Sequence, residues 1–204
     1  MDIIRLFPRV ISRDVVEKSV VLSVPSTEEY RSNAGNQSSR DKYVLNRPEL
    51  SLLKSILEEK VNNHFQEVYR PDTEGLYLYI TQSWFNTTEV QQYHHTHAHA
   101  NSILSGVLYF EVNDSDSIRF YAEGNKSSDL ILEFPTSDYT DLNSTSWTIG
   151  DLEHGSLLIF SSTLSHDVPE KGGEEEHNRV SLAFNTFVTG HIGDTDSLTE
   201  LILR

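Results

Sequence analysis

Two adjacent stretches decide the fold: YHHTHAH at residues 93–99 and NSILSGVLYF at residues 101–110. The first holds four of the nine histidines of the chain, and the second is mostly apolar, which is typical of a buried strand. Neutral imidazole is the commonest metal ligand in proteins, and four such rings packed together have little structural use. The sequence therefore predicts a metal site where a loop enters a core strand.

Length and composition bound the class of protein. With 204 residues, of which 37% are hydrophobic, the chain can form one sizeable core, and no shift in composition marks a boundary. We predict a single domain over residues 1–204. The net charge of −15 repels phosphate backbones and anionic lipids, so neither nucleic acid nor a membrane is an expected partner. The sequence is compatible with a homodimer.

The chain contains no cysteine, which excludes disulfides and thiolate metal sites and is compatible with a reducing cytoplasm. Residues 1–8 lack the apolar run of a signal peptide, and no stretch of about 18 apolar residues occurs that could span a bilayer. We therefore expect a cytoplasmic protein.

One helix is predicted after a polar segment, residues 26–42, which we interpret as a long surface loop. Asn46 can cap this helix, Pro48 suits its first turn, and Glu49 stands where a capping box needs it. Arg70 ends the pattern. The apolar stripe, with three- and four-residue spacing, consists of Leu53, Ile56, Leu57, Val61, Phe65 and Val68.

Beyond the helix, runs rich in β-branched and aromatic residues alternate with turn-forming clusters. Many short strands after one helix favour a β-sandwich or a barrel. The predicted strands are Leu76–Thr81, Ser102–Val112, Ser117–Ala122, Leu130–Phe134, Gly155–Phe160 and Arg179–Val188.

A polar face is predicted on the last of these strands. Every second residue of an extended strand shares a face, which here groups Arg179, Ser181, Ala183 and Asn185. Such a face is too polar for plain core and suits a small anion, because Arg forms a bidentate pair with a carboxylate. His166 lies just past the preceding predicted strand.

The pattern His-x-His, then a distant His, then an Arg-x-Ser strand resembles the Fe(II)/2-oxoglutarate oxygenases. The resemblance is closest to a family of small 2-oxoglutarate/Fe(II)-dependent oxygenases of bacteria and tailed phages, within the prolyl-hydroxylase-like superfamily. It covers nearly the whole chain. The matching segments are Leu6–Pro8, Tyr43–Leu50, Ser83–Asn86, His97–Gly106, Gly155–His166 and Arg179–Asn185.

The resemblance implies a fold and a metal. The fold is a double-stranded β-helix (jelly-roll, cupin-like), mainly β, with one long supporting helix near the N-terminus. The ligands of Fe(II) would be His97, His99 and His166. His99 then stands where most such oxygenases carry the carboxylate of a 2-His-1-carboxylate triad. Three neutral imidazoles leave the site with one negative charge fewer than the usual triad. The resemblance therefore determines the identity of the metal and its affinity less strictly here.

The resemblance also implies a co-substrate site. Arg179 would hold the distal carboxylate of 2-oxoglutarate with help from Ser181, and Tyr109 resembles a tyrosine that reaches the same carboxylate in prolyl hydroxylases. The implied dioxygenase reaction consumes 2-oxoglutarate and O₂, yields succinate and CO₂, and hydroxylates a substrate. A peptidyl (prolyl) residue is the favoured substrate and a small molecule the rival. For a phage-encoded chain the location would be the host cytoplasm.

Several alternatives remain. We interpret His94 and His95 as residues beside the metal or at the surface, and a His95/His97 ligand pair is the rival assignment. Arg179 is also compatible with a surface salt bridge to the acidic run Glu174–Glu176. Two other functions compete: a three-His cupin-type metal enzyme that uses no 2-oxoglutarate, and a non-catalytic jelly-roll binding protein.

Overall fold

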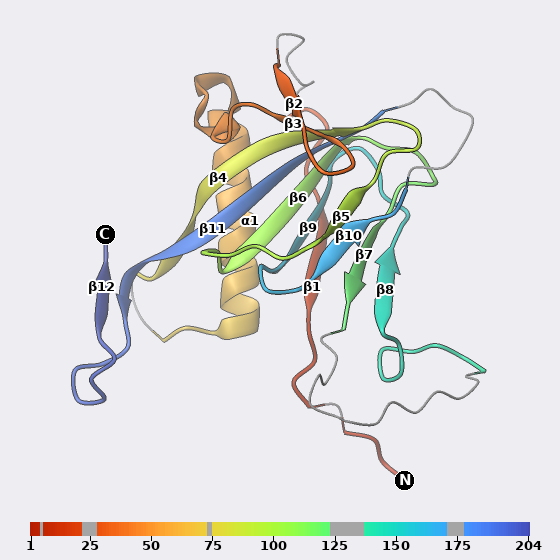
Figure 1. Cartoon of the computed structure of the whole chain (residues 1–204). Coiled ribbons are helices and arrows are strands. Elements are labelled where there is room, and N and C mark those ends of the chain that lie inside the picture. The colour runs from red at the N-terminus through yellow and green to blue at the C-terminus, as the bar shows by residue number, and fades with distance from the viewer. Residues whose placement is uncertain (5, 22–27, 73–74, 123–136, 171–177) are drawn as a thin grey trace.

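The structure is a computed structural model that describes all residues except 5, 22–27, 73–74, 123–136 and 171–177 (Figure 1). One long helix, α1 (Ser51–Tyr69), follows two 3-10 turns at Val44–Asn46 and Pro48–Leu50. The strands are β1 (Ile11–Val15), β2 (Tyr30–Ser32), β3 (Gln37–Ser39), β4 (Tyr77–Thr88), β5 (His94–His97), β6 (Leu104–Glu111), β7 (Ile118–Tyr121), β8 (Ser146–Ile149), β9 (Ser156–Ser161), β10 (His166–Val168), β11 (Arg179–Ile192) and β12 (Leu201–Leu203).

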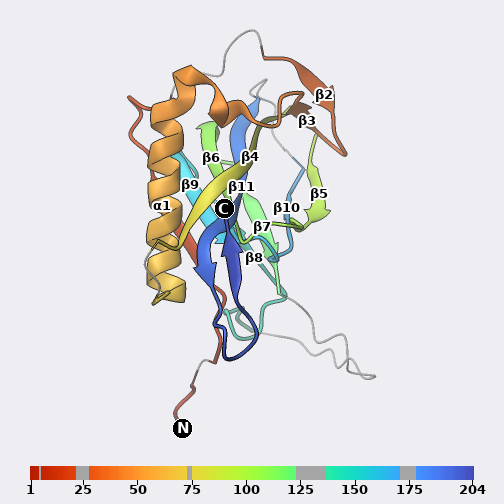
Figure 2. The ribbon, with the colours of Figure 1, turned by 90° about the vertical axis from the view of Figure 1, so that its left-hand side faces the viewer.

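The strands form two antiparallel sheets that face each other. Among the described residues, the larger sheet has eight strands in the order β1-β9-β6-β11-β4-β3-β2, with β12 paired to β11. The smaller sheet has four strands in the order β5-β10-β7-β8. Figure 2 shows α1 against one face of the larger sheet and the smaller sheet across the other face. The protein is therefore the mainly β jelly roll with one supporting helix that the sequence predicted.

Strand alternation divides the apolar residues into two cores. On the helix side, Leu57 of α1 belongs to one buried cluster with Phe85 of β4 and Leu182 of β11. Between the sheets, Phe160 of β9 belongs to a second cluster with Phe120 of β7. Val180, Leu182 and Phe184 of β11 belong to the helix-side cluster, so the residues that alternate with them in this part of the strand point into the space between the sheets.

The predicted helix is present, but its start was placed wrongly. The 3-10 turns occupy the expected first turn, so the residue before α1 is Leu50 and no side chain caps the helix. Asn46 instead accepts a hydrogen bond from Lys54 Nζ at 2.9 Å through its Oδ1. Arg70 ends the helix in the left-handed conformation, as expected of its C-terminal boundary. Within the described ranges, no helix is long and apolar enough to cross a bilayer.

Five of the six predicted strands are present, as β4, β6, β7, β9 and β11. The sixth, Leu130–Phe134, lies outside the described residues. The extended β4 includes Ser83–Asn86, and β11 continues to Ile192.

The histidine stretch is a loop only in part: His99 lies in the segment that leads into β6, as expected, but the residues before it form a strand. Residues His94–His97 form β5, and His166 does not merely follow a strand but begins β10. The described part of the predicted surface loop 26–42 contains the β2–β3 hairpin, which extends the larger sheet next to β4. These short strands lack apolar alternation, and pairing with distant segments stabilises them.

Gly106 in β6 provides a test of the packing. A Cβ at this buried position would lie against the Phe184 ring, so Gly106→Ala is expected to lower the free energy of unfolding by about 1–3 kcal/mol. The matched control is Gly150→Ala, because no atom lies within 4 Å of a Cβ there. Urea unfolding of the two variants measures the difference, and equal stability would contradict this packing.

Candidate active site

The core of the site is a strand pairing between two histidines. In the antiparallel ladder of β5 and β10, His97 stands directly opposite His166. Directly opposite residues of paired strands point to the same face, and the two ring centroids are 4.4 Å apart. Residues that are remote in the sequence thus share one spot on the smaller sheet.

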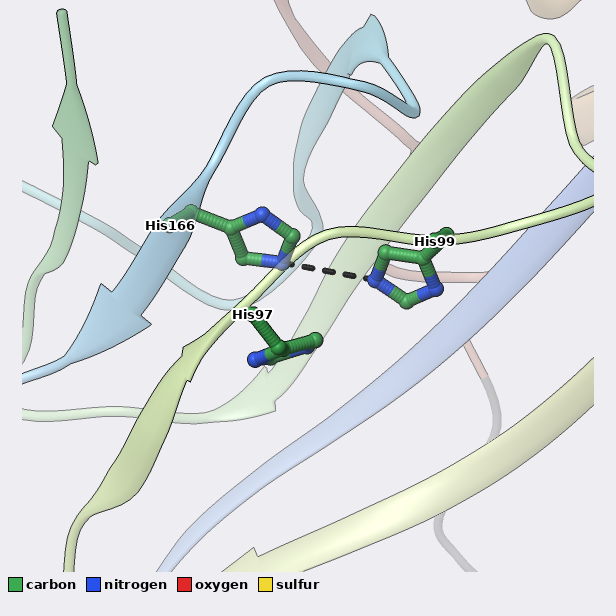
Figure 3. Close-up of side chains that lie close together, drawn as sticks. All are labelled: His97, His99 and His166. Atoms are coloured by element: carbon green, nitrogen blue, oxygen red, sulfur yellow. Dashed lines mark hydrogen bonds between the residues drawn. The ribbon is translucent and has the colours of Figure 1, made fainter. Parts of the chain in front are cut away.

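His99 completes the cluster from the segment that leaves β5. Its backbone N–H donates to the Ser162 carbonyl at 2.9 Å, which ties this segment to the end of β9. Figure 3 shows the three rings turned toward one another, with His99 Nε2 3.4 Å from His166 Nε2. One nitrogen from each of His97, His99 and His166 lies within 4.8 Å of the others.

Hydrogen bonds fix which ring nitrogens face the centre of the cluster. Nδ1 of His97 lies 2.7 Å from the His95 carbonyl, and Nδ1 of His166 lies 2.9 Å from the Leu164 carbonyl. A carbonyl only accepts, so each Nδ1 carries the proton and each Nε2 keeps its lone pair. Two nitrogens bound to one ion at about 2.1 Å lie roughly 3.0–3.4 Å apart. The 3.4 Å between His99 Nε2 and His166 Nε2 matches this spacing, and one nitrogen of His97 lies near both, which makes the three rings a candidate site for one transition-metal ion.

Burial keeps these rings neutral. Desolvation, reinforced by the neighbouring histidines, lowers the pKa of His99 to about 3. Burial lowers the pKa of His166 to about 4 and also lowers that of His97, despite the carbonyl that each ring faces. Neutral imidazole is the form that binds metals.

The two remaining histidines of the stretch lie differently. His94 also lines the pocket, its ring centroid is 4.4 Å from that of His97, and burial lowers its pKa to about 3. His95 is exposed and its Nδ1 lies 3.4 Å from the Ala34 carbonyl. The compact donor group includes neither of them.

A pocket lies beside the histidines and is partly open to solvent. Its wall on the larger sheet includes a polar row across three strands, in which Ser181 of β11 pairs with Asn86 of β4 and Tyr109 of β6. Arg179 and Ala183 of β11 also line the pocket. Asn185, the fourth residue of the predicted face, accepts a hydrogen bond from Ser105 at 2.9 Å.

Arg179 is buried, with 4% of its surface exposed. It is therefore not a surface residue, and the run Glu174–Glu176, its alternative partner, lies outside the described residues. Nη1 of Arg179 is 3.4 Å from Oδ1 of Asp116, whose side chain is also buried. Burial raises the pKa of Tyr109, the nearby Arg179 charge lowers it, and Asp116 adds to the rise.

The wall carries polar groups that a bound molecule could satisfy. Asn86 Oδ1 is buried without a hydrogen-bond partner, an arrangement that costs free energy unless a partner binds. A buried guanidinium and two hydroxyls, from Tyr109 and Ser181, lie on the same wall. The guanidinium and the hydroxyls are donors of the kind that a carboxylate accepts, whereas the Asn86 oxygen needs a donor.

Buried hydroxyls hold the segment that carries His99. Ser162 Oγ is 2.7 Å from Ser102 Oγ and 2.8 Å from Ser105 Oγ. All three serines lie in segments that the sequence analysis names, but Ser162 was given no role there. Its signal, a serine just past an apolar strand, is common in turns.

Asp167, next to His166, was also missed. Its carboxylate accepts hydrogen bonds from Arg119 at 2.8 and 3.1 Å, from Tyr121 at 2.5 Å and from Thr96 at 3.2 Å. These partners come from β7 and β5, which flank β10. Asp167 therefore acts as a clamp that links β10, which carries His166, to β5, which carries His97, and to β7.

The comparisons with known proteins agree with this geometry. A family model described as "Putative 2OG-Fe(II) oxygenase" matches residues 82–185, about half of the chain. The chain belongs to this family. It is thus a 2-oxoglutarate-dependent dioxygenase, an enzyme that uses Fe(II), 2-oxoglutarate and O₂. No curated protein matches the chain significantly.

Solved structures share the fold at low sequence identity. HygX from Streptomyces hygroscopicus, with nickel, 2-oxoglutarate and hygromycin B bound, is 13% identical, with 87% of this oxygenase and 82% of that chain covered and a TM-score of 0.57. A prolyl-4-hydroxylase from Pseudomonas putida is 12% identical, with 87% and 92% covered and a TM-score of 0.52. An oxidoreductase of the 2OG-Fe(II) oxygenase family from Burkholderia pseudomallei is 12% identical, with 79% and 72% covered and a TM-score of 0.53.

The Asp167 clamp predicts a pH dependence. Burial alone would raise the pKa of Asp167, but its hydrogen bonds from Arg119 and Tyr121 and the Arg119 charge lower it overall. A lowered folded-state pKa stabilises the protein above the unfolded value of about 3.9 and loses this effect as the pH falls through the folded value. Asp167→Asn is therefore expected to cost about 1–3 kcal/mol at pH 7.

The difference between wild type and Asp167→Asn should shrink as the pH falls below about 4. Urea unfolding at several pH values measures it, with the exposed Asp196→Asn as a control of equal charge change. A pH-independent difference would contradict an ionised clamp.

Proposed function

We propose that His97, His99 and His166 hold Fe(II), and that Arg179 anchors 2-oxoglutarate with Ser181 and Tyr109. The observation that carries this proposal is the meeting of three imidazole nitrogens, within 4.8 Å of one another, in a pocket that also contains a buried arginine. Residues 1–204 act as one oxygenase domain in this proposal.

The three histidines bind and orient the metal. In His97 and His166, the carbonyl at Nδ1 holds the ring so that Nε2 faces the ion. His99 replaces the usual carboxylate, and its ring stacks on Trp84 with centroids 5.9 Å apart. Imidazole suits iron as well as zinc, copper and nickel, so the three-His set fits Fe(II).

The larger sheet binds the co-substrate. Arg179 offers parallel N–H donors to the distal carboxylate, while the Ser181 and Tyr109 hydroxyls donate to the same oxygens. The burial of Arg179 excludes water from this contact, which strengthens it.

When bound, Fe(II) and 2-oxoglutarate supply the activation of O₂, with succinate and CO₂ as products. The chain itself supplies geometry and a dry wall. Phe160 packs edge-on against His166 with centroids 4.9 Å apart, and Trp84 covers His99. These rings shield the metal ligands from water on the protein side.

A peptidyl residue, with prolyl favoured, is the proposed substrate. The fold likeness to a prolyl-4-hydroxylase supports this choice, and the net charge of −15 would steer a basic protein toward the site. HygX, solved with hygromycin B bound, supports the rival of a small-molecule substrate. Mass spectrometry of candidate peptides after turnover, for a gain of one oxygen atom, separates the two.

Removing one ligand should remove the metal. His166→Ala is expected to lower the affinity for Ni(II), used as a stable substitute for Fe(II), at least about 100-fold, because two ligands remain. Calorimetric titration measures the affinity. His191→Ala is the control, since this exposed histidine pairs with Glu200 away from the pocket. Unchanged affinity in His166→Ala would end the proposed metal site.

Removing Arg179 should weaken the binding of 2-oxoglutarate without weakening the binding of the metal. Arg179→Met is expected to weaken 2-oxoglutarate binding at least about 30-fold, because the buried pair between the guanidinium and the co-substrate carboxylate is lost. Ni(II) should still bind, because the three histidines remain. Anaerobic spectroscopy of the Fe(II) protein supplies a second readout, a weak visible band that appears with bound 2-oxoglutarate. Turnover without 2-oxoglutarate would instead favour the three-His cupin-type enzyme.

A further inference from the structure

Asp116 stands behind the proposed anchor. It closes the turn before β7, where its N–H donates to the Asn113 carbonyl and its Oδ2 accepts from the Asn113 N–H, both at 3.0 Å. Its other oxygen, Oδ1, lies 3.4 Å from Arg179 Nη1. The side chains of Asp116 and Arg179 are only 1% and 4% exposed, so the pair is screened from water.

The Asp116–Arg179 pair matters because the pocket lining, as far as the structure describes it, offers Arg179 no other negative charge. Among the described residues that line the pocket, none is acidic, and the three candidate metal ligands are neutral rings. A buried guanidinium without a partner is strongly destabilising. Asp116 supplies the negative charge that lets Arg179 remain buried before any ligand arrives.

The same carboxylate opposes an incoming one. Carboxylates of Asp116 and of a bound dicarboxylate would both face the Arg179 guanidinium, and like charges in a buried site repel strongly. In the proposed site His99 replaces the usual acidic metal ligand. The site's negative charge is therefore the Asp116 carboxylate beside Arg179, and not a carboxylate on the metal.

We propose that Asp116 is a positioning residue that holds the Arg179 guanidinium and offsets its charge, so that this subsite alone binds a dicarboxylate weakly. This inference rests on the anchor role proposed above for Arg179. Succinate lacks the keto group that can chelate the metal, so it depends on this subsite more than 2-oxoglutarate does. Asp116 would therefore favour the release of the product.

The test is binding of succinate to the metal-free protein, measured by calorimetry. Asp116→Asn keeps the shape and removes the charge, and it should bind succinate at least about 10-fold more tightly than wild type. Asp114→Asn, an exposed residue of the same turn, should change the affinity less than about twofold. Damage to a merely structural residue would weaken binding, so a gain in affinity is specific to the proposal.

Two further variants keep the test decisive. Asp116→Glu retains the charge and should bind succinate as weakly as wild type. If Asp116→Asn does not fold, Asp116→Ser provides the neutral side chain for the same titration. Unchanged or weaker succinate binding in the folded neutral variant would overturn the inference.

Failure of the inference can be told from failure of the proposed function. If Arg179→Met leaves 2-oxoglutarate binding intact, the anchor itself is wrong and the role of Asp116 falls with it. If Arg179→Met abolishes binding and Asp116→Asn binds succinate like wild type, only the charge offset is wrong.

Discussion

The candidate metal centre depends on the antiparallel pairing of β5 with β10. This pairing sets His97 opposite His166, and the two rings acquire a common direction because paired residues share a face. Both strands are very short and polar, and they have little apolar surface of their own to keep them in register. The hydrogen bonds of Asp167 with partners on β5 and β7 supply that restraint. A single-residue slip would turn one histidine to the opposite face.

The larger sheet combines two roles through its alternation. Val180, Leu182 and Phe184 of β11 belong to the core against α1. Arg179, Ser181 and Ala183, which alternate with them, line the pocket. The core and the pocket thus use opposite faces of the same strand. The polar face is tolerated because backbone pairing and the helix-side core already stabilise β11.

Particular residues show how far sequence reasoning reaches. The helix, the long strands and the Arg179–Ser181 face followed from local period, because each element repeats its pattern over several residues. The strands β5 and β10 did not, since three or four polar residues carry no periodicity. The capping box at Asn46 failed because the 3-10 turns were favoured over a regular first helical turn.

Other parts of the site were beyond any local pattern. Asp116 looks like an ordinary turn residue, and its contact with Arg179 exists only because the end of β6 and the start of β11 meet in the sheet. The convergence of His99 with His166 came from the family resemblance and not from spacing. Contacts between distant segments are decided by the register of the whole sheet.

The chain has two tryptophans, and the fold gives them unequal surroundings. Trp147 on β8 is 52% exposed to solvent, whereas the indole of Trp84 stacks on the His99 ring. Indole fluorescence is quenched by nearby transition-metal ions and responds to changes at a ring in contact. The emission of Trp84 is therefore a natural optical reporter of what occupies the site, with Trp147 as an internal reference that lies apart from the histidine cluster.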